Sequence, residues 1–112
     1  MTHLPIVCTL GSAERRHRRE GVLRELFAQV AESQPLENGY AFRFVPKEGL
    51  VAEIARMIEL ESGCCAFLSF DLRVIAGGGP VWLTLTGPPG TKEFLETEIV
   101  HPVVQIVGGR MA

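Results

Sequence analysis

The stretch "ESGCCAFLSFDLRVIAGGGPVWLTLT", residues 61–86, holds a helix end, two adjacent cysteines and two expected strands. Residues 66–76 alternate, with Phe67, Ser69 and Asp71 on the opposite face from their neighbours, as a half-buried strand does. The run "GGGP" ends this strand, and residues 81–86 are expected to pair back on it as a hairpin. The prediction of the fold starts from this hairpin, and the other elements are placed before and after it.

The segments before the hairpin read as alternating helices and strands. Residues 48–62 are expected to form a helix that ends at Gly63 as its C′ residue, and "YAFRFV" at 40–45 alternates as a strand does. Apolar residues recur at three- and four-residue spacing over 13–32, which predicts a helix that Ser12 can cap. A short apolar run at 5–10, "PIVCTL", predicts a buried first strand.

After the hairpin, Thr91 can cap a third helix that carries Phe94, Leu95 and Ile99. The apolar tail at 103–107 is a last strand or helix, or part of a subunit interface. The resulting order β-α-β-α-β-β-α predicts an α+β fold, a two-layer sandwich with a mixed sheet. A chain of 112 residues fits one domain, so residues 1–112 are expected to form a single unit.

The composition narrows the class of protein. A net charge of −2 suggests neither a nucleic acid nor a membrane surface as partner, and the basic run "ERRHRRE" at 14–20 is expected to be a solvated helix face. No stretch resembles a secretion signal or is apolar for long enough to span a bilayer. Three cysteines, an odd number, favour thiols in a reducing compartment, so a cytoplasmic location is expected.

The cysteine pair adjoins a carboxylate that the helical pattern turns inward. Glu61 falls within the apolar arc of the 48–62 helix, and one further turn would bring Cys64 and Cys65 beside it. A buried carboxylate without a partner is costly, so Glu61 should be protonated, bonded to nearby backbone or thiol groups, or engaged with a cation or ligand. A thiol-centred site at Glu61, Cys64 and Cys65 follows from this placement.

The ligand types favour a soft ion. Adjacent cysteines differ from the C-x2-C or C-x4-C spacing that is usual for structural zinc, whereas mercury, copper(I) or arsenic(III) demands less of the spacing and prefers thiolate. Cys8 is the candidate third thiol, because it precedes a helix N-terminus, whose dipole favours thiolate, with Arg15 and Arg19 on that helix. The competing interpretation is that all three cysteines are small core residues.

The segment "ESGCCAFLSFDL" also resembles a family of small uncharacterised bacterial proteins, related to segments fused to some MerR-type regulators. The family pattern is a glutamate, two residues, two cysteines, proline and phenylalanine. Glu61, Cys64, Cys65 and Phe67 match it, whereas Ala66 stands where proline is usual. The resemblance implies a thiol-centred site and effector sensing, and no defined reaction.

Three functions remain open on the sequence. The first is a ligand-binding module in which Cys64, Cys65, Cys8 and Glu61 hold a soft metal or metalloid ion; any regulatory output would then need a partner, since no DNA-binding motif is present. The second is a small cysteine-dependent enzyme with Cys8 or Cys65 as nucleophile or redox centre and Glu61 as proton acceptor, although no histidine base is identifiable. The third is a structural protein, a homodimer in which the cysteines are core.

Overall fold

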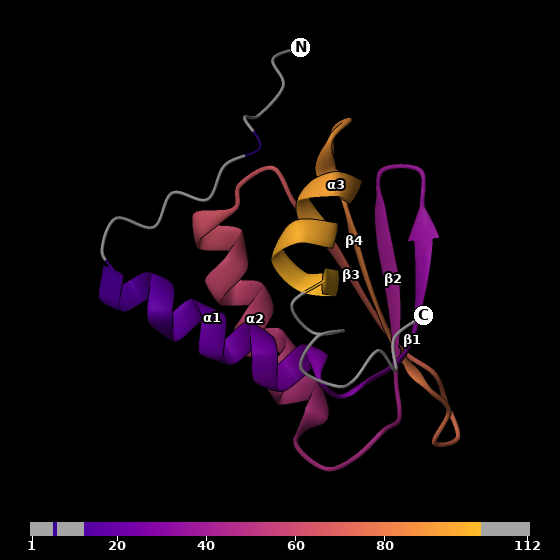
Figure 1. The fold of residues 1–112 in the computed structure, drawn as a ribbon. Helices are drawn as coiled ribbons and strands as arrows, with labels where there is room; N and C mark the ends of the chain where they lie inside the picture. Colours follow the sequence, from indigo (N-terminus) through magenta and orange to yellow (C-terminus); the bar gives the residue numbers. More distant parts are fainter. Residues whose placement is uncertain (1–5, 7–12, 102–112) are drawn as a thin grey trace.

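The chain folds into a four-stranded sheet with helices on one of its faces (Figure 1). The computed structural model describes residue 6 and residues 13–101, and the predicted first strand with Cys8 and the tail at 103–107 lie outside them. Its elements in chain order are α1 (Ala13–Phe27), β1 (Val30–Leu36), β2 (Gly39–Phe44), α2 (Leu50–Cys64), β3 (Ser69–Val74), β4 (Val81–Thr86), α3 (Thr91–Leu95) and the π-helix η1 (Glu96–Val100).

The fold class is α+β, as predicted, but the order and the sheet type differ from the prediction. Within the described residues the order is α-β-β-α-β-β-α, and the strands are arranged β1-β2-β4-β3. Every pairing among the described strands is antiparallel, so this part of the sheet is not the mixed sheet that was predicted. The sheet consists of two hairpins joined by the pairing of β2 with β4, which requires no parallel crossover.

The largest local difference is strand β1, which falls where the sequence predicted the end of a helix. Helix α1 stops at Phe27, and residues 30–36 pair with β2 through a turn at Glu37 and Asn38. Val30 stands four residues after Leu26, which is a helical spacing, but it is the first residue of β1. Because β1 is a largely exposed edge strand that includes Pro35, it lacks the apolar alternation that identifies central strands.

Two helix boundaries also differ. Helix α2 continues through Gly63 to Cys64, and Gly63 is not among the glycines with positive φ, so it is not the C′ residue that was predicted. Gly90 with φ 102° is the N-cap of α3, and the Thr91 hydroxyl donates to the carbonyl oxygen of Pro88 at 2.7 Å instead of capping the helix. The predicted hairpin of β3 and β4 is confirmed, with Gly77 and Gly78 at positive φ in its loop.

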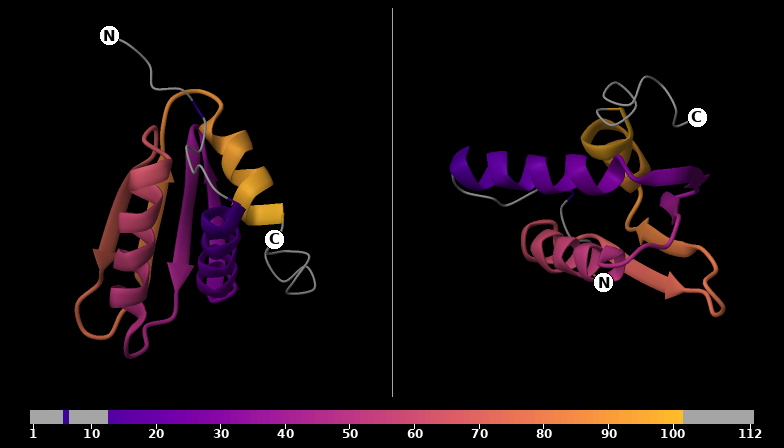
Figure 2. Two further views of the ribbon diagram at one scale, coloured as in Figure 1. Left: turned by 90° about the vertical axis from the view of Figure 1, so that its left-hand side faces the viewer. Right: turned by 90° about the horizontal axis from the view of Figure 1, so that it is seen from below.

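The core lies between the helices and one face of the sheet (Figure 2). The predicted alternation in β2 is confirmed on its inner face, where Phe42 and Phe44 are fully buried, whereas Val45 beyond it is 64% exposed. Phe27 of α1 packs edge-on to Phe42, with the ring centroids 5.0 Å apart. Among the described residues, no helix has the length and apolar character needed to cross a bilayer.

The two central strands approach closely at Gly39. A Cβ built on Gly39 would overlap the carbonyl oxygen of Leu85 on β4, whereas a Cβ on Gly21, within α1, meets nothing within 4 Å. Gly39→Ala should therefore lower the free energy of unfolding by about 1–3 kcal/mol, because the strands must separate to admit the methyl group. Gly21→Ala should raise it by about 0.5–1 kcal/mol, because alanine favours a helix interior. Denaturant unfolding of both variants tests the pair, and equal effects would contradict it.

Tyr40 links β2 to η1, because its buried ring carries a hydroxyl that donates to Glu96 Oε2 at 2.7 Å. Burial, then the hydrogen bond to Glu96, raises the pKa of Tyr40 to about 12. Because this folded pKa exceeds the unfolded value of about 10, the stabilisation is complete below pH 10 and is lost as the pH rises through 12. Tyr40 is the only tyrosine, so the phenolate absorbance reports it alone, and an ordinary midpoint in the folded protein would contradict the assignment.

Candidate metal-binding site

Glu61, Cys64 and Cys65 meet at the C-terminal end of α2. The helix continues to Cys64, and Cys65 follows as its C-cap with a backbone N–H that donates to the Glu61 carbonyl oxygen at 2.6 Å. The three residues therefore occupy about one turn and face the same side of the helix. Their exposed fractions are 1%, 3% and 0%, which confirms the prediction that Glu61 points inward beside the cysteines.

The sulfur and carboxylate atoms of this cluster converge. The two Sγ atoms lie 3.7 Å apart, Cys64 Sγ lies 3.7 Å from Glu61 Oε2, and Cys65 Sγ lies 3.7 Å from Glu61 Oε1. One ligand atom from each residue can be chosen so that all three lie within 4.8 Å of one another, and the cluster can therefore hold a metal ion.

A guanidinium group from α1 neutralises the buried carboxylate. Arg19 donates to both carboxylate oxygens of Glu61, from Nε to Oε2 at 2.6 Å and from Nη2 to Oε1 at 2.9 Å. The same Nη2 lies 3.8 Å from Cys65 Sγ, and Nη1 donates to Glu98 Oε1 at 3.3 Å. The partner that the buried Glu61 requires is thus a cation of the protein, in a two-point geometry that arginine favours.

Arg19 corrects the interpretation of the basic run at 14–20 as a solvated face. Its exposed fraction is 5%, whereas His17 and Glu20 in the same run are exposed. The signal was available, because Arg19 stands four residues before Leu23 and seven before Leu26, on the stripe of α1 that faces the core. Glu98, the second acceptor of Arg19, carries no comparable signal in the sequence.

The surroundings keep Cys65 protonated. Burial raises the pKa of the Cys65 thiol, the Glu61 carboxylate and the Cys64 thiol raise it further, and Arg19 opposes them only in part. A nucleophilic cysteine needs an accessible thiolate, so Cys65 has the opposite of the required environment. The described histidines, His17 and His101, are both exposed. Cys65 therefore fits the predicted thiol enzyme poorly.

The structure thus brings together three of the four predicted site residues, Glu61, Cys64 and Cys65, while Cys8 lies outside the described residues. Cys64 and Cys65 also belong to the hydrophobic core cluster, as the competing interpretation requires. No protein-family model matches the chain, and neither a curated protein nor a solved structure is significantly similar to it.

The buried ion pair predicts a large and asymmetric mutational effect. Arg19→Leu leaves the Glu61 carboxylate buried without its main partner, so the free energy of unfolding should fall by about 3–5 kcal/mol. The double variant Arg19→Leu/Glu61→Leu removes both charges and should be more stable than the single variant. Thermal and denaturant unfolding give both values.

Glu53→Gln on the same helix is the matched control. Glu53 is only half-buried and accepts hydrogen bonds from Gln29 at 3.1 and 3.2 Å, so neutralising it should cost less than about 1 kcal/mol. If Arg19→Leu costs no more than Glu53→Gln, the Arg19–Glu61 pair does not contribute as described.

Proposed function

We propose that the protein is a thiol-centred module that binds one soft metal or metalloid ion through the sulfurs of Cys64 and Cys65, with Glu61 as the third ligand. The observation that supports it is the convergence of two thiols and one carboxylate within 4.8 Å at a buried helix end. Thiolates select soft ions over calcium and magnesium, which take oxygen ligands.

The sulfur separation supports an ion with three or four ligands. With metal–sulfur bonds of about 2.3 Å, a tetrahedral angle separates two sulfurs by about 3.8 Å, whereas a linear arrangement needs about 4.6 Å. The observed Sγ–Sγ distance of 3.7 Å agrees with the first value. The pair can therefore bind such an ion without moving apart.

The charge of the site suits a divalent ion or a neutral metalloid hydroxide. A divalent ion that displaces the two thiol protons forms a neutral dithiolate complex and releases two protons. Arsenite, As(OH)3, forms two As–S bonds with the same thiols and releases two waters, which also leaves the charge unchanged. Direct ligation by Glu61 requires Arg19 to release one carboxylate oxygen, so ion binding and the α1 contact compete for Glu61.

The proposal also includes the expected roles of Cys8, of the cellular location and of a partner. Cys8 supplies a third thiol in it, the protein acts in the cytoplasm, and a dimer or another partner transmits any regulatory output. The Glu-x-x-Cys-Cys-x-Phe segment that Glu61, Cys64, Cys65 and Phe67 form is consistent with effector sensing of the kind that the family resemblance implies.

The test is a titration of the fully reduced protein with cadmium, mercury(II) and arsenite, with magnesium as comparator. We expect one equivalent to bind, seen as the mass of the intact complex and as thiolate-to-metal absorption for cadmium and mercury. Cys64→Ser and Cys65→Ser should each weaken binding by at least about 100-fold, because one of two thiolates is lost. The affinity for cadmium should fall as the pH falls, because protons compete for the sulfurs.

Two controls separate binding from stability and test the contribution of Cys8. Met57→Ala removes a fully buried side chain from the same helix and should destabilise the fold by about 2–5 kcal/mol while the ion still binds the folded protein. Cys8→Ser should weaken binding less than the other two serine variants. If the thiols of the wild type react only after denaturation and no ion binds, Cys64 and Cys65 are core residues and the proposal fails.

A further inference from the structure

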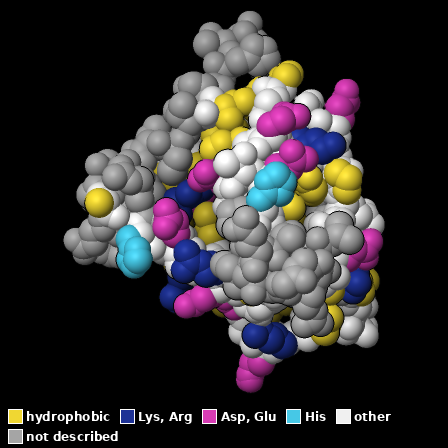
Figure 3. Space-filling model, in the orientation of Figure 1, with side chains coloured by type: hydrophobic (Ala, Val, Ile, Leu, Met, Phe, Trp, Pro, Cys, Tyr) yellow, Lys and Arg dark blue, Asp and Glu magenta, His cyan; other side chains and the backbone are white. Residues whose placement is uncertain are grey.

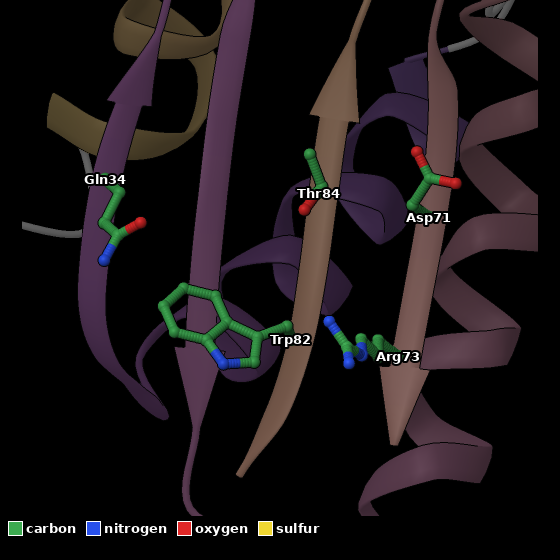
Figure 4. A pocket seen from close by; sticks show the side chains of 5 residues that line it. All are labelled: Gln34, Asp71, Arg73, Trp82 and Thr84. Carbon is green, nitrogen blue, oxygen red and sulfur yellow. The ribbon is translucent and has the colours of Figure 1, made fainter. Parts of the chain in front are cut away.

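The face of the sheet opposite the helices carries a shallow open pocket that the thiol site does not use. Its volume is about 290 Å³, and Figure 4 shows the side chains that line it. Five side chains from three strands line it, from β1, β3 and β4: Gln34, Asp71, Arg73, Trp82 and Thr84. None of these residues contributes to the Glu61, Cys64 and Cys65 cluster, so the pocket is a separate feature of the molecule.

The register of the strands explains why this face is hollow. Ala41 on β2 lies between Gln34 on β1 and Thr84 on β4, and Thr84 in turn pairs with Asp71 on β3. In this row of the sheet, the small side chains of Ala41 and Thr84 lie on the two central strands, and longer side chains lie on both edge strands. Gly39, two residues before Ala41 on the same face, cannot carry a side chain without meeting Leu85.

Trp82 forms one wall of the pocket and is the only tryptophan of the chain. It is half-exposed, and its indole reaches from β4 over β2 toward Gln34 (Figure 4). In β-sheet register it stands between Arg43 and Arg73, but Arg43 pairs with Glu32 at 2.9 Å. Because Arg43 is engaged with Glu32, the indole of Trp82 stays partly exposed to solvent beside polar groups. Sites that recognise a ligand with one apolar face have this arrangement.

The charged groups of the pocket are oriented away from each other. The Arg73 guanidinium is directed over β4 toward Trp82, whereas the Asp71 carboxylate is directed away from it (Figure 4). No ion pair joins these two residues in the part of the chain that the structure describes, although they lie two apart on one strand face. Both therefore present hydrogen-bonding groups to a ligand, and together they add no net charge.

We propose that this pocket binds the ring of a neutral sugar, with one ring face against Trp82 and the hydroxyls bonded to Asp71, Arg73 and Gln34. Arginine only donates hydrogen bonds, a carboxylate only accepts them, and an amide does both. A sugar hydroxyl can do either, so one uncharged ligand satisfies all three groups. The carbon–hydrogen face of the same ring supplies apolar surface for the indole.

Charge and size support this class of ligand over the alternatives. Asp71 repels a phosphate and Arg73 repels a cation, so neither a nucleotide nor an amine gains from the full set of lining residues. On the face of the molecule that Figure 3 shows, acidic and basic side chains are intermixed. A volume of about 290 Å³ lies at the lower end of the range of small-molecule pockets, which favours a single ring over a larger ligand.

The single tryptophan provides a direct test, since its fluorescence reports on the pocket alone. The reduced full-length protein is titrated with glucose, galactose, mannose, N-acetylglucosamine and their β1,4-linked or α1,4-linked trimers, and with glucose 6-phosphate, AMP and lysine as charged comparators. We expect a saturable change with at least one neutral sugar, with a Kd of about 1 mM for an open site of this size.

Variants assign the binding to this pocket. Asp71→Asn and Arg73→Gln should each weaken the sugar at least about tenfold, and Thr84→Val should leave the fold intact while lowering affinity. Arg43→Gln is the matched control, since Arg43 pairs with Glu32 on the same face and does not line the pocket; its affinity should equal that of the wild type. Trp82→Ala is followed by isothermal titration, because it removes the reporter.

Several results would overturn the proposal. These are no saturable response to any neutral sugar up to about 50 mM, tighter binding of glucose 6-phosphate, AMP or lysine than of every neutral sugar, or equal loss in Arg43→Gln. A fluorescence change that depends on protein concentration without added sugar, together with a change in sedimentation that Trp82→Ala abolishes, would instead make this face an interface between two copies.

Discussion

The buried ion pair between Arg19 and Glu61 is the contact on which the arrangement of the helices depends. It joins α1 to the end of α2, and through Glu98 it reaches η1, so three helical segments meet at one guanidinium group. The aliphatic and aromatic residues of α1 that enter the core, Leu23, Leu26 and Phe27, lie C-terminal to Arg19. Among the described side chains in the first half of α1, Arg19 is the one that is buried, and it attaches this part of the helix to α2 and η1.

The same pair explains how two thiols and a carboxylate can be buried together. A buried carboxylate is tolerated only with a charged or hydrogen-bonding partner, and two-point donation by Arg19 supplies it. With that charge balanced, both sulfurs can lie 3.7 Å from the carboxylate oxygens, and burial raises the pKa of the Cys65 thiol. The positive charge of Arg19 and the negative charge of Glu61 offset each other, which permits the place of this cluster in the core.

The sequence correctly predicted the features that depend on local periodicity. It did not predict the features that depend on which strand a segment pairs with. The β3–β4 hairpin, the inner face of β2 and the inward position of Glu61 each follow from spacing within one segment, and the structure agrees with all three. Strand β1 could not be found that way, because an edge strand with little burial has no apolar alternation, and its partner β2 determines its structure. The prediction of a mixed sheet followed from that omission. With β1 present, the described strands form two hairpins, and two hairpins can join without a parallel pairing.

The candidate site likewise contains one part that local spacing predicts and one part that depends on long-range packing. Spacing along α2 was enough to place Cys64 and Cys65 beside Glu61, whereas the Arg19 contact spans 42 positions of the chain and depends on how two helices pack. Helical periodicity in α1 shows only that Arg19 faces inward; it does not show what Arg19 meets. The distinction matters for the proposed function, because Arg19 and an incoming ion compete for Glu61. Under the proposed function, an ion must displace the proton of the Cys65 thiol, whose pKa is raised by burial, and this favours thiophilic ions. Occupation of the site would then weaken the contact that fastens the first half of α1, and so alter the surface that this helix presents.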